Sequence, residues 1–92
     1  MDFTTPFPKF AVEAWRPYRL SCYYKGGRDG KIELRFCRED GAPTGIASVS
    51  IISSRRWREV GLVVFAPISA SHAQVRIWAK KMMVDRLSVT PE

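Results

Sequence analysis

Apolar and polar residues alternate along most of the chain, a pattern typical of β-strands that bury one face. The clearest run is 31–37, in which every second residue is apolar. Clusters rich in glycine, proline and aspartate separate the runs, as at 26–30 and 40–45, and indicate turns. The predicted strands are 9–15, 18–25, 31–39, 46–52, 57–66, 73–79 and 84–90. This series predicts an all-β protein built as an antiparallel β-sandwich or barrel.

Two connections decide how the strands are joined. Residues 26–30, "GGRDG", have the glycines and the aspartate of a hairpin loop, and 80–83 predict a tight connection between the last two strands. The segment 72–87 has the length of a helix, but its β-branched and aromatic residues and its apolar alternation favour strands. We therefore expect strands throughout.

The two phases of the alternation predict a core and an outward face. The expected core residues are Tyr18, Leu20, Ile32, Leu34, Phe36, Val60, Leu62, Val64, Val75, Ile77 and Leu87. The opposite phase mixes aromatic residues with arginine and glutamine: Tyr23, Arg35, Gln74, Arg76 and Trp78. Val63 and Phe65 also have this outward phase. A second apolar face indicates a contact with a ligand or with another protein.

Length and composition limit the class of protein. The chain has 92 residues, of which 46% are hydrophobic, so we expect one globular domain over 1–92 with a proline-rich lead at 1–10. No stretch approaches the roughly 18 apolar residues that cross a bilayer, and we expect no membrane partner. The N-terminus lacks the basic and apolar regions of a signal peptide. We therefore expect the protein in the cytoplasm or in a phage particle.

The net charge of +6 permits an anionic partner but does not demand one. Basic residues are spread along the chain, and "RRWR" at 55–58 is their one local cluster in the sequence. A solvated loop is the simpler interpretation of this run. Trp57 could stack on a base, but single-strand binders typically offer several aromatic rings. We therefore do not expect nucleic acid as the partner.

The two cysteines have neither a zinc-binding spacing nor a CxxC redox spacing. By strand phase, Cys22 points into the core and Cys37 points to the opposite face of its sheet. A disulfide would need a bulge to join them. We expect two free thiols, with Cys22 in the core and Cys37 at the surface.

The order of several segments is distinctive. A tyrosine-led strand, "YRLSCYYK", precedes "IELRFCREDG", which ends in an acidic-glycine turn. Next comes "WREVGLVVFAP", which runs from a tryptophan to Ala-Pro, and the strands "AQVRIWA" and "VDRLSVT" complete the series. Over residues 11–90 this order resembles the jelly-roll carbohydrate-binding modules of the galactose-binding-like type. The resemblance implies a jelly-roll sandwich that binds a glycan without catalysis.

The chain departs from that family in two places. Such modules usually carry an additional N-terminal strand region, where this chain has a short proline-rich lead. They often close with two adjacent aspartates that help to bind a structural calcium ion, whereas Asp85 stands alone. Calcium takes about six to eight oxygen ligands. Asp85 is the one weak candidate for a calcium ligand, and an acid that accepts hydrogen bonds within the protein is its simpler interpretation. We therefore expect no cofactor.

Two classes of function remain. In the first, the chain is a non-catalytic glycan-binding domain whose outward rings stack on sugars while Arg and Gln side chains bond the hydroxyls. In the second, it is a structural or assembly protein, for example a phage virion subunit, with Val63 and Phe65 covered by another subunit. In both we expect a homo-oligomer, which would protect a sheet edge. We do not expect an enzyme, because no motif places a nucleophile or an acid beside His72, the single histidine.

Overall fold

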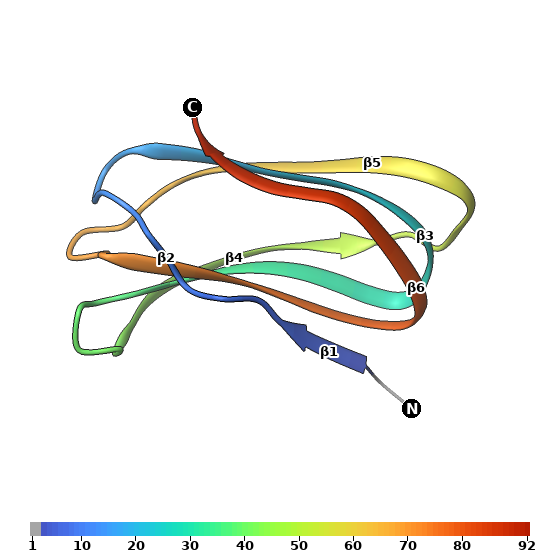
Figure 1. Ribbon diagram of the computed structural model, residues 1–92, viewed down its shortest axis with the longest axis horizontal. Coiled ribbons are helices and arrows are strands. Elements are labelled where there is room, and N and C mark those ends of the chain that lie inside the picture. Colours follow the sequence, from blue (N-terminus) through green and yellow to red (C-terminus); the bar gives the residue numbers. More distant parts are fainter. Residues whose placement is uncertain (1–2) are drawn as a thin grey trace.

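Strands form most of the computed structural model, which describes residues 3–92 and, of their side chains, those of 7–79 and 81–92. In chain order they are β1 (Phe3–Pro6), β2 (Phe10–Ala11), β3 (Pro17–Cys37), β4 (Pro43–Ile51), β5 (Ser54–Phe65) and β6 (His72–Pro91). All their pairings are antiparallel. The predicted all-β sandwich is confirmed (Figure 1). The described residues contain no helix that is long and apolar enough to cross a membrane.

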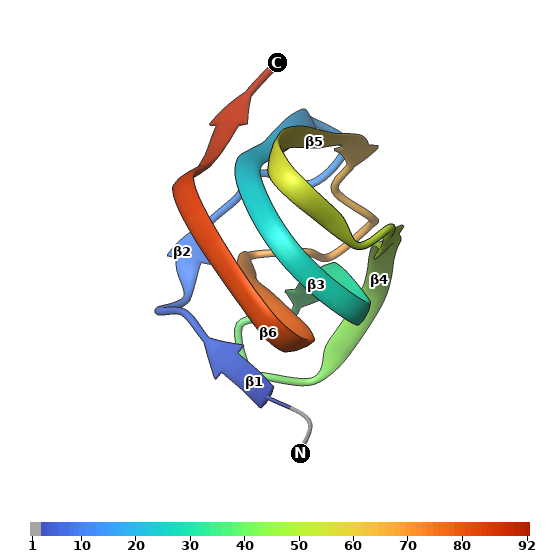
Figure 2. The same ribbon diagram turned by 90° about the vertical axis from the view of Figure 1, so that its right-hand side faces the viewer.

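The two longest strands, β3 and β6, run through both layers of the sandwich. The first half of β3 lies between β5 and the second half of β6, and we call this sheet the β5 layer. The second half of β3 lies between β4 and the first half of β6, and β1 and β2 pair with β6 beyond it. We call this sheet the β4 layer. Figure 2, which views the sandwich from one end, shows β3 and β6 passing side by side from one layer to the other.

The passage between the layers, which we call the corner, consists of residues 25–31 of β3 and 80–83 of β6. Gly26 and Gly27 have φ angles of 84° and 89° there, and Lys81 has a φ of 51°. A side chain at Gly26 would collide with the carbonyl oxygen of Lys81, so the two strands approach closely only because Gly26 has no Cβ. The predicted hairpin at 26–30 is wrong. The glycines bend β3 into the other layer, next to β6, and the predicted break at 80–83 is the matching bend of β6.

The predicted N-terminal strand at 9–15 is also wrong in its extent. Only Phe10 and Ala11 pair with β6, as β2. Beyond them Val12 donates its backbone N–H to the carbonyl oxygen of Ser71, and Trp15 turns with a φ of 67°. The Trp15 N–H then bonds the carbonyl oxygen of Ala66, so the chain leaves the β4 layer for the β5 layer.

The core lies between the two layers, where the alternation predicted it. Ile32, Leu34 and Phe36 are almost completely buried, as are the predicted residues of β6, Val75 and Ile77. Tyr18 and Leu20 are also buried, and the remaining predicted residues, Val60, Leu62, Val64 and Leu87, are partly buried against this cluster. Tyr24, in the same phase as Tyr18 and Leu20, is buried with them. The core also contains residues that the alternation did not identify: Val12, Ile51, Ala66, Ala70 and Ala73.

Both cysteines are free thiols, and Cys22 lies in the core as expected. Burial raises the pKa of the Cys22 thiol to about 11. The prediction of a surface position for Cys37 is wrong, because only 6% of this residue is exposed. The register of β3 shifts between Phe36 and Cys37, and the Cys37 thiol donates to the carbonyl oxygen of His72 at 3.7 Å.

Candidate functional site

The outward face of the β4 layer brings together four of the five predicted binding residues. In the β3–β6 ladder, Trp78 lies opposite Lys31, Arg76 lies opposite Glu33 and Gln74 lies opposite Arg35. Side chains at these positions share one face because cross-strand partners point to the same side of a sheet. The predicted set Arg35, Gln74, Arg76 and Trp78 is therefore one surface.

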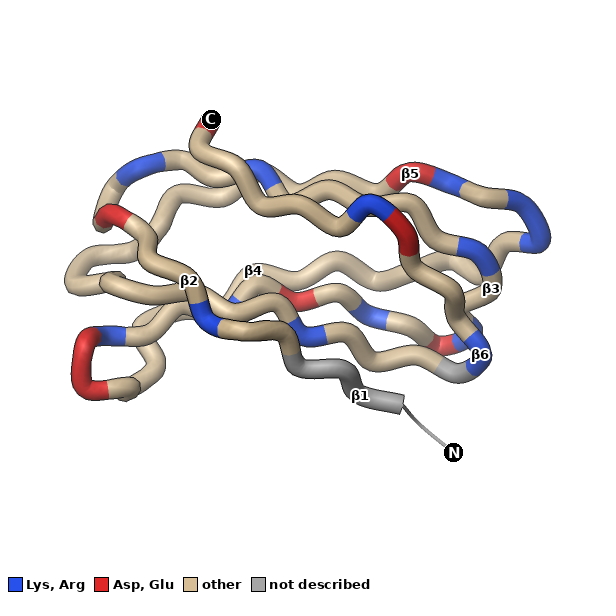
Figure 3. The backbone as a smooth tube through the Cα atoms, viewed as in Figure 1, with Lys and Arg blue, Asp and Glu red and all other residues tan. Residues whose placement is uncertain are grey.

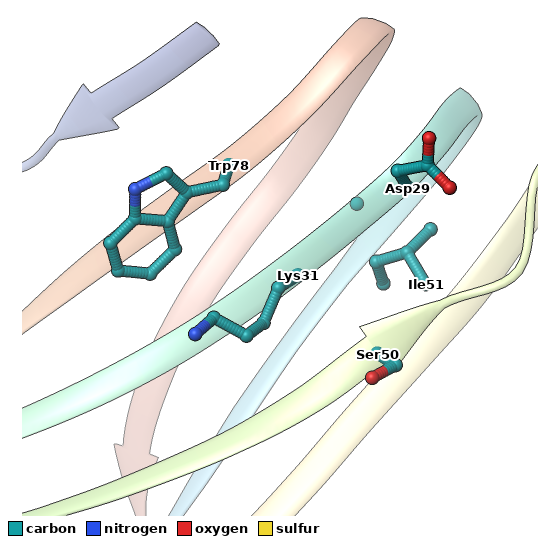
Figure 4. Close-up of a pocket in the computed structure, with 6 residues that line it drawn as sticks. Asp29, Lys31, Ser50, Ile51 and Trp78 are labelled. Carbon is teal, nitrogen blue, oxygen red and sulfur yellow. The ribbon is translucent and has the colours of Figure 1, made fainter. Parts of the chain in front are cut away.

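A hollow of about 540 Å³ lies at the corner end of this face. Its lining residues are Asp29, Gly30, Lys31, Ser50, Ile51 and Trp78. Figure 4 shows the Trp78 ring on β6, Lys31 on the neighbouring β3, and Ser50 and Ile51 on β4 beyond it. The hollow therefore combines an indole ring, an ammonium group, a carboxylate and a hydroxyl.

Two cations approach the Trp78 ring. The Lys31 ammonium lies 4.6 Å from the ring centroid, and the Arg76 guanidinium carbon lies 5.3 Å from it. These distances are those of cation–π contacts. The Nε of Arg76 is buried and has no hydrogen-bond partner among the described residues.

Glu33 organises the charges beside the hollow. The alternation of β3 puts Glu33 on the outward face with Lys31 and Arg35, but only 4% of the residue is exposed. Its carboxylate accepts a hydrogen bond from the Nε of Arg35 at 3.2 Å and lies 3.7 Å from the Lys31 ammonium. A buried carboxylate needs such partners, so Glu33 fixes both cations on this face.

Gln74 and Arg35 lie further along the face, away from the lining of the Trp78 hollow. The Gln74 amide donates to the carbonyl oxygen of Phe7 at 2.6 Å, which holds the N-terminal segment on the sheet. A smaller hollow of about 150 Å³ adjoins both residues and also borders Lys9 and Cys37. The predicted ligand role of Gln74 thus competes with an existing hydrogen bond.

Tyr23, the fifth predicted binding residue, lies on the other sheet. It pairs with Glu59 of β5 and Asp85 of β6 and faces outward from the β5 layer. There it lines a hollow of about 200 Å³ with Trp57, Asp85 and Arg86. The Arg86 guanidinium carbon lies 5.9 Å from the Tyr23 ring centroid.

The calcium candidate Asp85 uses one carboxylate oxygen to accept the backbone N–H of Arg86 at 2.9 Å. Within the part of the chain that the structure describes, no group of three or more histidine, cysteine, aspartate or glutamate residues could hold a metal ion.

The predicted interface residues lie on the outward face of β5. Val63 is 47% exposed and Phe65 is 63% exposed. Trp15 and Ile68 are each 65% exposed, and the backbone bond from Trp15 to Ala66 places Trp15 beside the end of β5. These four exposed side chains belong to the end of β5 or to the residues that adjoin it, and we call them the apolar end.

Sequence reasoning missed Asp29 and Ser50. Asp29 belonged to a presumed hairpin loop, and Ser50 to the polar phase of a strand. Their proximity to Trp78 depends on how β4, β3 and β6 are aligned, since Lys31 pairs with both Ser50 and Trp78. The signal that could have found Asp29 is its position in a glycine-rich bend next to the Lys31 strand.

Comparisons with known proteins identify the fold. No protein-family model and no curated protein matches the sequence. Among solved structures, the enzymatically active domain of tailspike protein 4 from bacteriophage CBA120 aligns with a TM-score of 0.84 and 16% identity over 99% of this chain. A CBM4 structure aligns with a TM-score of 0.68 and 12% identity, also over 99% of this chain. The chain spans 14% of the tailspike chain and 61% of the CBM4 chain. The likeness to both structures establishes the β-sandwich fold.

Proposed function

We propose that the chain is a non-catalytic domain of the galactose-binding-like jelly-roll type that binds a glycan on the outward face of the β4 layer. The observation that carries the proposal is the hollow beside Trp78, which Lys31, Asp29 and Ser50 also line. An indole ring offers a flat surface to the C–H face of a sugar, while the carboxylate, hydroxyl and ammonium groups can bond its hydroxyls. The CBM4 neighbour, a carbohydrate-binding module by its abbreviation, supports the same function.

The acid content of the hollow favours binding over hydrolysis. Glycosidases generally place two carboxyl groups across the bond that they cleave. Asp29 is the one carboxylic acid among the described residues that line the Trp78 hollow. We therefore assign Asp29 to hydroxyl binding, with Trp78 as the platform and Arg76 as a cation that holds the ring.

A glycan array followed by titration of the best ligand tests this proposal. Trp78→Ala should reduce binding roughly five- to hundred-fold, on the scale of the about 1–3 kcal/mol that stacking of a base on an aromatic side chain contributes. Trp15→Ala is the matched control, since Trp15 is a largely exposed tryptophan outside the hollow.

Tyr23→Ala distinguishes binding on the β5 layer from binding on the β4 layer. Binding that survives Trp78→Ala but not Tyr23→Ala would place the ligand on the β5 layer, and a wild type that binds no glycan would reject the proposal.

The apolar end supports a second candidate, an assembly module. Val63, Phe65, Trp15 and Ile68 are all large apolar side chains with high exposure. Such patches usually mark contacts with another protein. The alignment with a short part of a much longer phage tailspike chain agrees with a virion subunit or domain. Both functions can coexist, because the apolar end and the Trp78 hollow share no residue.

A further inference from the structure

The net charge of the protein is concentrated at one end of the sandwich. Three segments meet at the corner, residues 25–31, 54–59 and 80–86: Gly26 pairs with both Ser54 and Met82. These segments contain nine of the fifteen lysines and arginines and three of the nine acids, which gives a formal charge of +6. The rest of the chain contains six of each sign. We call these three segments the cationic end, and Figure 3 shows its basic positions at the right of the molecule.

Most of these cations, as far as their side chains are described, form no ion pair with an acid. Four of the five ion pairs in the described residues contain no residue of the cationic end, as in Arg16 with Glu13 and Arg38 with Asp40. The fifth joins Lys31 to Glu33. Within the described side chains, no ion pair involves Arg55, Arg56 or Arg58. Their charge is therefore available to a partner.

Both aromatic hollows open at this end, one on each face. The Trp78 hollow includes Lys31 and Asp29, and the Tyr23 hollow includes Arg86 and Asp85. Each hollow thus joins an aromatic ring to a cation and a carboxylate. The ring can stack on a sugar and the carboxylate can accept hydroxyl protons, while the cation can bond an anionic group of the ligand.

We propose that the ligand is an acidic glycan, a polysaccharide with carboxylate or sulfate groups, bound at the cationic end with Lys31 bonding an anionic group in the Trp78 hollow. This inference rests on the proposed function and names the chemical class of its ligand. Lys31 can serve because its side chain is 45% exposed while its ammonium lies over the indole. Nucleic acid fits less well, since an acidic glycan offers hydroxyl protons to the Asp29 and Asp85 carboxylates beside its anionic groups, whereas the sugar-phosphate backbone of single-stranded DNA offers them none.

Paired polysaccharides test the charge preference directly. The probes are polygalacturonate, hyaluronate, polysialic acid and heparin, each beside its carboxyl-reduced or desulfated form, with neutral polysaccharides and a single-stranded oligonucleotide added. We expect binding to at least one acidic polymer and at least ten-fold weaker binding to its uncharged form. Binding should also weaken as salt rises, because ions screen exposed charges.

Two triple variants with equal net charge locate the site. Arg55→Gln/Arg56→Gln/Arg58→Gln removes three cations from the cationic end, and Arg16→Gln/Arg19→Gln/Arg38→Gln removes three from elsewhere. At about two-fold per exposed charge, the first variant should bind roughly ten-fold more weakly, whereas the second should change binding less than two-fold. Lys31→Gln should reduce the preference for the charged polymer while retaining binding to its uncharged form.

The outcomes separate the two proposals. Equal or tighter binding of uncharged glycans, lost in Trp78→Ala, would overturn the acidic ligand and leave the glycan-binding function standing. Binding to no glycan would remove both. Tighter binding to the oligonucleotide than to any polysaccharide would overturn both in favour of nucleic acid, and equal losses in the two triple variants would overturn the assigned location.

Discussion

Lys31 and Trp78 are direct cross-strand partners in the β3–β6 ladder, and the Lys31 ammonium lies 4.6 Å from the centroid of the Trp78 ring. Glu33 holds the same ammonium from the side, at 3.7 Å. The indole and the cation are therefore positioned before any ligand arrives. A preformed platform loses less conformational entropy on binding than a mobile one.

The contact between Lys31 and Trp78 should appear as a coupling in protein stability. In a double-mutant cycle of Lys31→Gln and Trp78→Leu, we expect a coupling free energy of about 0.5–1 kcal/mol, typical of a partly exposed cation–π pair. Urea unfolding of the four proteins measures it. Lys25→Gln combined with Trp78→Leu is the control and should be additive, because the cross-strand partner of Lys25 is Met83 and not Trp78. Additivity in the Lys31 cycle would contradict the contact.

The corner should depend on Gly26 for a reason that Gly41 does not share. Both glycines have positive φ angles, 84° and 90°, so alanine is strained at either. A Cβ at Gly41 meets no atom within 4 Å, whereas at Gly26 it collides with the Lys81 carbonyl oxygen. We expect Gly41→Ala to lower the free energy of unfolding by about 1–2 kcal/mol, and Gly26→Ala to lower it by a further 1–3 kcal/mol or so. Equal losses on urea unfolding would show that β6 can yield at the corner.

The alternation of Ile32, Leu34 and Phe36 was sufficient to predict the fold class and the centre of the core. It could not predict the corner, because glycines in a loop signal a turn but not its destination. The same local sequence suits a hairpin within one sheet and a bend from one layer into the other. Only the long ladder between β3 and β6, residues far apart in the chain, distinguishes the two.

The site was predictable in part for the same reason. Strand phase placed Arg76 and Trp78 on the outward side of one strand and Arg35 on the outward side of another, since phase is a local property. It left open whether the two strands share a sheet. It could not decide that Tyr23 faces away on the other layer, because that depends on which half of β3 belongs to which sheet. Nor does phase say what covers an outward residue, and so the burial of Glu33 was missed.

The Cys22 thiol should make the protein sensitive to alkali. Burial raises its pKa from the ordinary 9.0 to about 11. Between these values the folded state holds more protons than the unfolded state, so its stability falls as pH rises. Relative to Cys22→Ala, wild type should lose about 2 kcal/mol by pH 11. Urea unfolding from pH 8 to 11 tests this, and parallel curves for the two proteins would contradict it.

The apolar end should decide the oligomeric state. If Phe65 is covered by another copy of the chain, Phe65→Asp places a carboxylate without a partner in that contact, at a cost of several kcal/mol. We expect a wild-type oligomer that Phe65→Asp dissociates into folded monomers, measured by size-exclusion chromatography with light scattering.

Ile52→Asp is the matched control, because Ile52 is 73% exposed and lies between β4 and β5, outside the apolar end. It should leave the oligomer intact. A monomeric wild type would reject the assembly function, and dissociation by both variants would place the contact elsewhere.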